Sequence, residues 1–207
     1  ARAQVLLQLG QLSLSGKSDP DAALGYFSQA LETFRRSVGG GSIQTAGAYN
    51  ELSTAAAWKN DYALAERYSR AALAIFQVAV SSNHPDRTAT MQSLGFYLLK
   101  QGKLAEAEPL LRESLAAERR VFGSNHVRVA TDIEHLSQLQ RARGDLSGAL
   151  GSAREALTIT RTNLGDTHYM TGYYFDALAD LQFAAGDYAD GHDRGDEGDA
   201  KAENVAG

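Results

Sequence analysis

The chain has 207 residues, of which 43% are hydrophobic and 22% charged, and its formal net charge is −5. It contains no cysteine, which excludes disulfides and thiolate metal sites and favours a cytoplasmic location. No run of about 18 or more apolar residues is present, so no membrane partner is expected. The net negative charge comes from the residues after Gly186, and the acidic and basic residues before them balance. The charge pattern therefore lacks the basic footprint of a nucleic-acid-binding protein.

The first helix pair is predicted over residues 2–42. Its first helix carries Leu6, Leu9, Gly10 and Leu14 at helical spacing. Asp19 is expected to cap the second helix, with Pro20 at its first position. The second helix places its apolar residues on one face: Ala23, Phe27, Ala30, Leu31 and Phe34. The glycines of residues 39–41 follow a helix rather than a strand, so they predict a helix stop and not a phosphate-binding loop.

The stretch from Thr90 to His126 recurs 42 residues earlier and 42 residues later. The markers that stay in phase are Leu52, Asn60, Ala65, Leu73 and His84; Leu94, Gly102, Ala107, Leu115 and His126; and Leu136, Gly144, Ala149, Leu157 and His168. Each copy predicts two helices joined by a tight turn. Periods of about 20 to 50 residues are typical of solenoids. The small residues Ala65, Ala107 and Ala149 and their partners Ala72, Ser114 and Ala156 predict close packing along one face of each second helix.

We therefore expect one array with repeats at residues 2–42, 43–86, 87–127, 128–169 and 170–203. The fifth repeat begins with Tyr174, Phe175, Leu178 and Ala179 on its first helix. Its second helix then has Gly191, Gly195 and Gly198, and each glycine costs about 0.8–1 kcal/mol of helix stability. We expect a weak helix to about Ala202. A polar capping repeat and a truncated longer array both fit this pattern.

These residues carry a family resemblance. The pattern LxxLGxxLxxxGKLAEAExLLxxSL, with Gln101-Gly102-Lys103 at the turn and Asn83-His84-Pro85 in the loop, resembles the tetratricopeptide repeat of the longer kinesin-light-chain type. The resemblance implies an all-α, right-handed solenoid of about five antiparallel helix pairs. It also implies a concave groove lined by the first helices, which binds peptides or proteins without a catalytic centre or cofactor. His-Pro is kept only at His84-Pro85, because Val127 and Tyr169 follow the other two histidines and Ser42 replaces the first.

Three candidate sites for chemistry each have a structural alternative. Equivalent histidines in successive repeats lie about 10 Å or more apart, so they cannot share a metal whose ligands lie about 2.0–2.2 Å from one point. A structural role at the loops is expected for them. Glu106, Glu108 and Glu113 lie on a helix with Arg112 and predict a solvated face. The acidic tail lacks the spacing of a calcium loop, and no nucleophile, base and acid are arranged for catalysis.

Binding is expected on the first helices, at the positions one, two and five after the first core residue. These are Asn50, Glu51 and Thr54; Gln92, Ser93 and Phe96; Glu134, His135 and Gln138; and Asp176, Ala177 and Asp180. One turn further on lie Trp58, Leu99, Lys100, Arg141 and Phe183. Trp58 and Phe96 fit either a peptide-binding surface or a gap between first helices. The acids at these positions would repel a carboxylate, so a basic or neutral ligand is favoured.

The sequence therefore predicts a protein-interaction scaffold that binds a protein or peptide segment and is not an enzyme. An alternative is the ligand-sensing arm of a larger, bacterial-type signalling or transcription regulator. The absence of an initiating Met motivates this alternative, because it indicates a piece of a longer protein. Self-association through exposed array ends, giving a homo-oligomer, is a further possibility.

Overall fold

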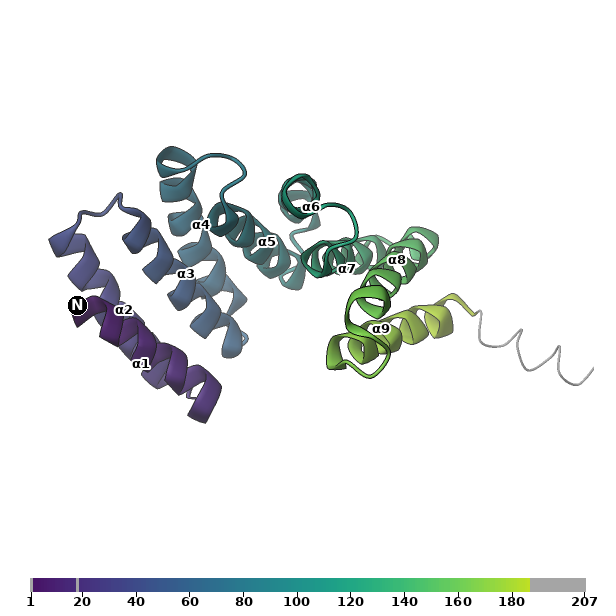
Figure 1. Cartoon of the computed structure of the whole chain (residues 1–207), viewed down its shortest axis with the longest axis horizontal. Helices are drawn as coiled ribbons and strands as arrows, with labels where there is room; N and C mark the ends of the chain where they lie inside the picture. The colour runs from purple at the N-terminus through teal and green to yellow at the C-terminus, as the bar shows by residue number, and fades with distance from the viewer. Residues whose placement is uncertain (1, 18, 187–207) are drawn as a thin grey trace, which may run out of the picture. The chain divides into compact units, whose positions relative to one another are not determined.

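A computed structural model describes residues 2–17 and 19–186 of the chain, and all regular structure within these residues is α-helical (Figure 1). The chain divides into two compact units, unit 1 (Ala1–Gly123) and unit 2 (Ser124–Gly207). Unit 1 contains α1 (Arg2–Lys17), α2 (Pro20–Ser37), α3 (Ile43–Trp58), α4 (Tyr62–Ala79), α5 (Pro85–Lys100) and α6 (Leu104–Phe122). Unit 2 contains α7 (Val127–Ala142), α8 (Leu146–Leu164) and α9 (Tyr169–Ala185). Consecutive helices pack as pairs, which confirms the predicted helical-repeat architecture.

The turns inside the pairs are built at the positions that the period predicts. Asn60, Gly102 and Gly144 have φ angles of 58°, 74° and 82°, and Gly186 after α9 has 78°. These values lie in the left-handed region, which glycine enters without steric cost and asparagine tolerates better than most residues. The chain can therefore reverse within about three residues and lay the second helix against the first.

The contact between paired helices depends on small side chains, as expected. Ala65, Ala107 and Ala149 and the set Ala72, Ser114 and Ala156 are fully buried at their common register positions. Larger apolar side chains pack beside such residues: Phe76, which is also fully buried, clusters with Ala72, and Phe27 clusters with Ala23 and Ala55. Small residues allow the helix axes to approach to about 8–10 Å, and the neighbouring rings then exclude water from the contact.

Most helices begin beside a side chain that accepts a hydrogen bond from the exposed backbone of their first turn. Asp19 is the N-cap of α2, as predicted, and its Oδ1 accepts from the Ala22 amide at 2.9 Å. The three in-phase histidines have the same role for first helices. Nδ1 of His84, His126 and His168 accepts from the amide two residues later, each at 3.2 Å. The structural role predicted for these histidines is therefore helix capping.

Ser42, which replaces a histidine in the first copy, also caps its helix, because its Oγ accepts from the Thr45 amide at 3.1 Å. A histidine that accepts through Nδ1 carries its proton on Nε2. The period therefore preserves an acceptor at the start of the first helix rather than one residue type.

Two apolar residues of the predicted first helices, Leu9 and Phe175, are exposed. Leu9 lies outside the buried side of α1, which consists of Ala3, Leu6, Gly10, Ser13 and Leu14. Gly10 is the close-contact position there, since a Cβ on it would overlap the Phe27 ring of α2. Phe175 is exposed because no described helix follows α9 and covers it. The predictions for the second helix of the fifth repeat and for the acidic tail lie outside the described residues.

Candidate binding face

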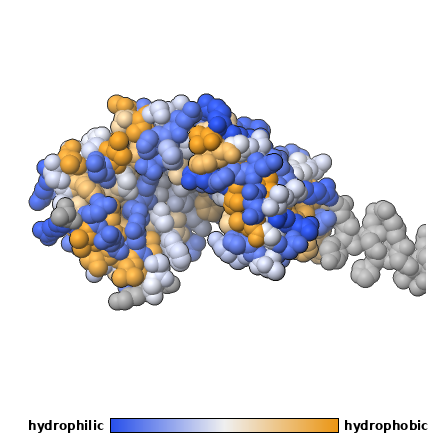
Figure 2. Space-filling view, in the orientation of Figure 1, coloured by the Kyte–Doolittle hydropathy of each residue, from blue (hydrophilic) through white to orange (hydrophobic). Residues whose placement is uncertain are grey.

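The first helices of unit 1 lie next to one another and present one side to solvent. Leu9 and Leu12 of α1, Glu51, Thr54 and Trp58 of α3, and Gln92, Phe96 and Lys100 of α5 form this side, which we call the first-helix face of unit 1. Leu9 and Leu12 occupy the register positions of Glu51 and Thr54, so adding the period to the first repeat would have identified them. Figure 2 shows hydrophobic surface over the part of unit 1 that α1 forms.

Polar pairs join these helices near their midpoints. Asn50 Nδ2 donates to Thr90 Oγ1 of α5 at 2.8 Å, and Gln11 Nε2 of α1 donates to Glu51 Oε1 at 2.8 Å. Burial raises the pKa of Glu51, and the hydrogen bond from Gln11 only partly offsets that rise. Asn50, one of the residues expected to contact a partner, is already hydrogen-bonded within the fold.

Aromatic side chains dominate the C-terminal half of the face. The Trp58 side chain is 56% exposed at the end of α3. Phe96 is half-buried, with its ring centroid 6.3 Å from that of Tyr62 and 6.0 Å from that of Tyr97. Lys100 Nζ lies 5.0 Å from the centre of the Phe96 ring, a cation–π geometry. Phe96 thus belongs partly to the core and partly to the surface, whereas Trp58 belongs to the surface.

Two residues expected on this kind of face are buried. Leu99 follows Tyr97 and Leu98, and all three are buried. Glu134 of α7 likewise follows Asp132 and Ile133, which are both buried. Three consecutive residues of a helix point in three directions. The helix is therefore covered on several sides at residues 97–99 and 132–134. Leu99 and Glu134 are therefore not among the side chains exposed to a partner.

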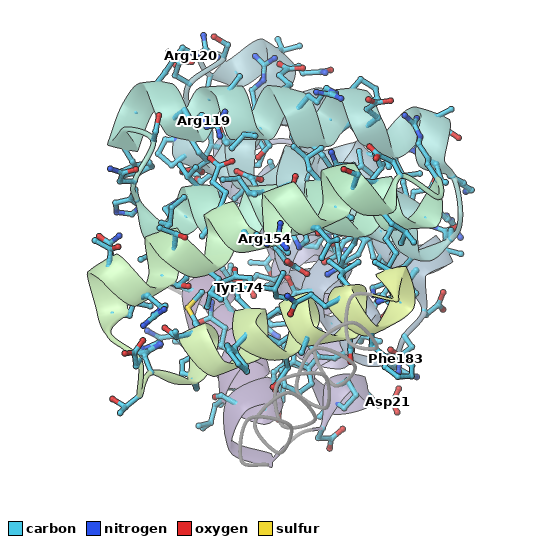
Figure 3. All side chains as sticks on the ribbon, turned by 90° about the vertical axis from the view of Figure 1, so that its right-hand side faces the viewer. Asp21, Arg119, Arg120, Arg154, Tyr174 and Phe183 are labelled. Atoms are coloured by element: carbon cyan, nitrogen blue, oxygen red, sulfur yellow. The ribbon has the colours of Figure 1, made fainter. Side chains whose placement is uncertain are left out.

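Unit 2 presents a different set of side chains at the same positions. On α7, Gln138 and His135 are half-buried and Arg141 is exposed. On α9, Asp176, Asp180 and Phe183 are exposed, together with Tyr169 and Tyr173, which the sequence-based selection missed. Figure 3 shows Phe183 projecting away from α9, whereas Tyr174 lies between α9 and its neighbours. Tyr174 is buried, and its hydroxyl lies 3.3 Å from Thr131 Oγ1 of α7.

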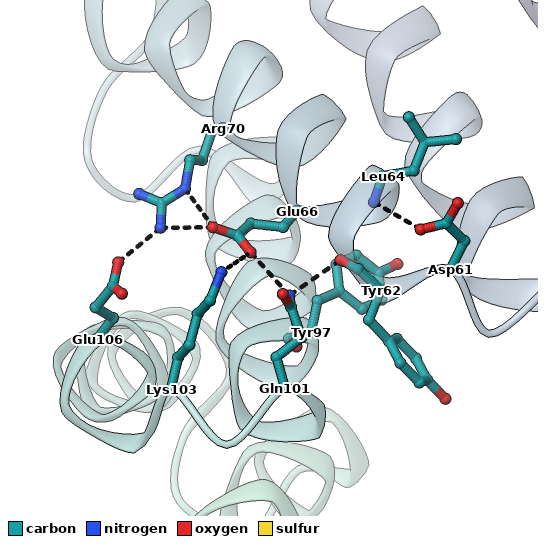
Figure 4. Close-up of polar contacts among 9 residues, drawn as sticks. All are labelled: Asp61, Tyr62, Leu64, Glu66, Arg70, Tyr97, Gln101, Lys103 and Glu106. Carbon is teal, nitrogen blue, oxygen red and sulfur yellow. Dashed lines mark hydrogen bonds and ion pairs between the residues drawn. The ribbon is translucent and has the colours of Figure 1, made fainter.

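A charged network in unit 1 joins its second and third repeats (Figure 4). Glu66 Oε2 accepts from Lys103 Nζ at 2.7 Å and from Gln101 Nε2 at 2.8 Å, and Arg70 Nη2 lies 2.9 Å from Oε1. Burial acts to raise the pKa of Glu66, but the donors from Lys103, Gln101 and Arg70 together lower it. The carboxylate is therefore held in its charged form.

Arg70 extends this network to α6, since its Nη2 also donates to Glu106 Oε2 at 2.7 Å. Glu108 pairs with Arg112 at 2.9 Å, and Glu113 lies 3.6 Å from Arg87. Glu106, Glu108 and Glu113 of α6 are thus each paired with an arginine side chain. Within residues 2–17 and 19–186, no three His, Asp or Glu side chains are arranged to hold a metal ion. None of the helices described is both long and apolar enough to cross a membrane.

Successive hairpins with a common register, small residues at their contacts and equivalent caps define a helical-repeat protein. The family model for the tetratricopeptide repeat matches residues 44–118 and 87–162, together more than half of the chain. The chain belongs to the tetratricopeptide repeat family. Arrays of this kind are typically protein-interaction scaffolds, and the fold is usually non-catalytic.

Solved structures with the same fold include a putative kinesin light chain with nearly identical TPR-like repeats from Podosopora anserina. That match has a TM-score of 0.76 and 18% identity, and it covers 100% of this chain and 98% of that chain. BtubC (BKLC) from P. vanneervenii matches with a TM-score of 0.77 and 20% identity, over 99% of this chain and 82% of that chain. At these identities the likeness shows the fold alone. Comparison with curated protein sequences gives no match.

Proposed function

We propose that the chain is a scaffold whose first-helix face binds a protein or peptide segment. The observation that carries this proposal is Trp58, the only tryptophan in the chain, which is 56% exposed on that face. Exposed aromatic side chains supply large contact areas with little loss of conformational entropy, and tryptophan is enriched among residues that dominate binding energy. The buried side of α3 is supplied by Leu52, Ala55 and Ala56, so the indole is not needed for the core.

The other aromatic residue of the first-helix face, Phe96, supports binding to a preformed surface. The Phe96 ring is fixed by contacts with Tyr62 and Tyr97, and Lys100 places a cation above it. A bound segment would cover the indole and the exposed part of the Phe96 ring. Because the helices are already packed, little ordering would accompany binding, which favours affinity.

The test compares Trp58→Ala with a matched control. Val78 is 90% exposed on α4, a second helix, so Val78→Ala removes an exposed apolar side chain away from the first-helix face. Partners captured by the wild-type protein are identified, and the affinity of each purified partner is then measured for all three proteins. We expect Trp58→Ala to weaken binding by about 30-fold or more, in keeping with a dominant contact of about 2 kcal/mol. Val78→Ala should leave the affinity within about twofold. Equal affinities for wild type and Trp58→Ala would contradict the proposal.

A further inference from the structure

The solvent-facing side of α9 combines aromatic rings and carboxylates in a regular order. Tyr169, Tyr173, Asp176, Asp180 and Phe183 follow one another at intervals of four, three, four and three residues. This spacing keeps all five on one side of a helix. Tyr169 is 79% exposed and Phe183 is 77% exposed, and the other three are also exposed. We call these five residues the α9 face.

The exposure of the α9 face does not result from a loosely attached helix. On its other side, Leu181 is buried against Ala149, Leu150 and Ala153 of α8. Tyr174 is buried as well and reaches Thr131 of α7. The helix is thus held by two neighbours, and its exposed rings lie on a fixed support. Exposed apolar side chains that gather on one side of a fixed helix are a feature of interaction sites.

The charge of the α9 face selects the class of partner. Helix α9 contains Asp176 and Asp180 but no Lys, Arg or His. Beside Tyr173, helix α7 contributes another acid: burial raises the pKa of Tyr173, and the charge of Glu134 raises it further. From Gly165 to Gly186, where the described residues end, the sequence has three acidic residues, Asp166, Asp176 and Asp180, and no Lys or Arg. Such a balance attracts cationic segments and repels acidic ones.

We propose that the α9 face binds a partner segment rich in arginine or lysine, which deepens the proposed scaffold function by naming the partner class. The aliphatic part of each cationic side chain packs on Tyr169, Tyr173 or Phe183, and its charged end pairs with Asp176 or Asp180. Arginine fits best, because its guanidinium stacks on aromatic rings and binds a carboxylate through two hydrogen bonds. A second copy of α9, or the chain's own acidic residues 187–207, would bring like charge to the two aspartates.

The test uses the full chain and two fluorescein-labelled synthetic peptides. One consists of four repeats of Arg-Leu-Ala-Ala, and the other replaces every Arg by Glu. Fluorescence anisotropy is recorded at low and high NaCl. We expect only the Arg peptide to bind, with an affinity that falls as salt rises. Two double variants of the α9 face should each weaken binding of the Arg peptide by about tenfold or more: Asp176→Asn/Asp180→Asn and Tyr169→Ser/Phe183→Ser.

A control with the same change in charge separates the α9 face from general attraction. The double variant Asp187→Asn/Asp190→Asn changes two aspartates outside the described residues. It should change the affinity for the Arg peptide by less than about twofold. The inference is overturned by an equal loss in this control, by binding of the Glu peptide, or by failure of the Arg peptide to bind. It is also overturned if light scattering shows a dimer of the wild-type chain that the α9 variants abolish. A neutral or acidic partner that depends on Trp58 but not on the α9 face would leave the scaffold proposal intact and remove this one.

Discussion

Helices α5 and α9 lie two 42-residue periods apart, yet equivalent apolar residues on them have opposite environments. Met91 of α5 is 1% exposed, whereas its equivalent on α9, Phe175, is 62% exposed. Leu99 is 9% exposed and its equivalent Phe183 is 77% exposed. A third pair, Tyr97 and Leu181, is buried in both helices. The period therefore fixes the direction in which a side chain points, and the neighbouring helices determine whether it is covered.

The difference follows from what packs on each helix. Helix α5 contacts α4 and α6, and Leu111 of α6 comes close enough to leave no room for a Cβ on Gly95. Helix α9 packs on α8, and no described helix follows it. Met91 and Leu99 of α5 thus stabilise the fold, whereas Phe175 and Phe183 of α9 stay exposed.

The largest loss of stability is expected when the buried member of the Met91 and Phe175 pair is shortened. Met91→Ala should lower the free energy of unfolding by about 2–5 kcal/mol, because it removes a fully buried side chain and leaves a cavity. Phe175→Ala should change it by less than about 0.5 kcal/mol, as is usual for surface substitutions. Urea denaturation followed by circular dichroism measures both. Similar losses for the two variants would show that Phe175 is covered in solution.

A smaller effect is expected at the close contact between α5 and α6. On Gly95 a Cβ would lie 2.7 Å from Leu111 Cδ2 and 3.4 Å from the Leu111 backbone nitrogen. Gly95→Val should therefore destabilise the fold by about 1–3 kcal/mol through overpacking. The equivalent substitution on α9, Ala179→Val, should cost less than about 0.5 kcal/mol, because Ala179 is only half-buried. Thermal unfolding of both variants checks the pair, and a Gly95→Val variant as stable as wild type would contradict a rigid contact at this position.

The contacts of α4 with its following helix depend on pH, whereas the equivalent contacts of α8 do not. Glu66 has Leu150 as its equivalent, which packs on Leu181 without any charge. Since the pKa of Glu66 is lowered in the fold, its charge stabilises the protein above the ordinary Glu pKa, and this contribution is lost as pH falls through the lowered value. Glu66→Gln should cost about 1–2 kcal/mol at neutral pH. The difference from wild type should shrink below about pH 4. A difference that stays constant with pH would contradict the charged network.

The smallest effect concerns a feature that both regions share. His84 caps α5 and His168 caps α9 through the same Nδ1 contact. Because a cap acts locally, His84→Ala and His168→Ala should each cost about 1 kcal/mol, and Ser at either position should recover most of it. Ser42 already caps α3 in this way. Chemical denaturation of the four variants provides the measurement, and an Ala variant as stable as wild type would exclude the capping role.

Most of the architecture could be predicted because it depends on local sequence. The turns at Asn60, Gly102 and Gly144 and the small residues such as Ala107 are set by backbone conformation and by the period. Burial of Leu99 and exposure of Phe175 could not be predicted, since both depend on which helices lie beside them. The engagement of Asn50 by Thr90 was also beyond sequence reasoning, because it joins two different repeats. The right-handed course of the array and its ligand remain predictions.

Fluorescence of Trp58 reports directly on the first-helix face of unit 1, because the chain has no other tryptophan. The emission of the unbound protein should have the long wavelength of a hydrated indole and be readily quenched by acrylamide. Addition of a captured partner should shift the emission to shorter wavelength and protect it from the quencher. A partner that binds while the emission and quenching of Trp58 stay unchanged would contradict binding on the first-helix face of unit 1.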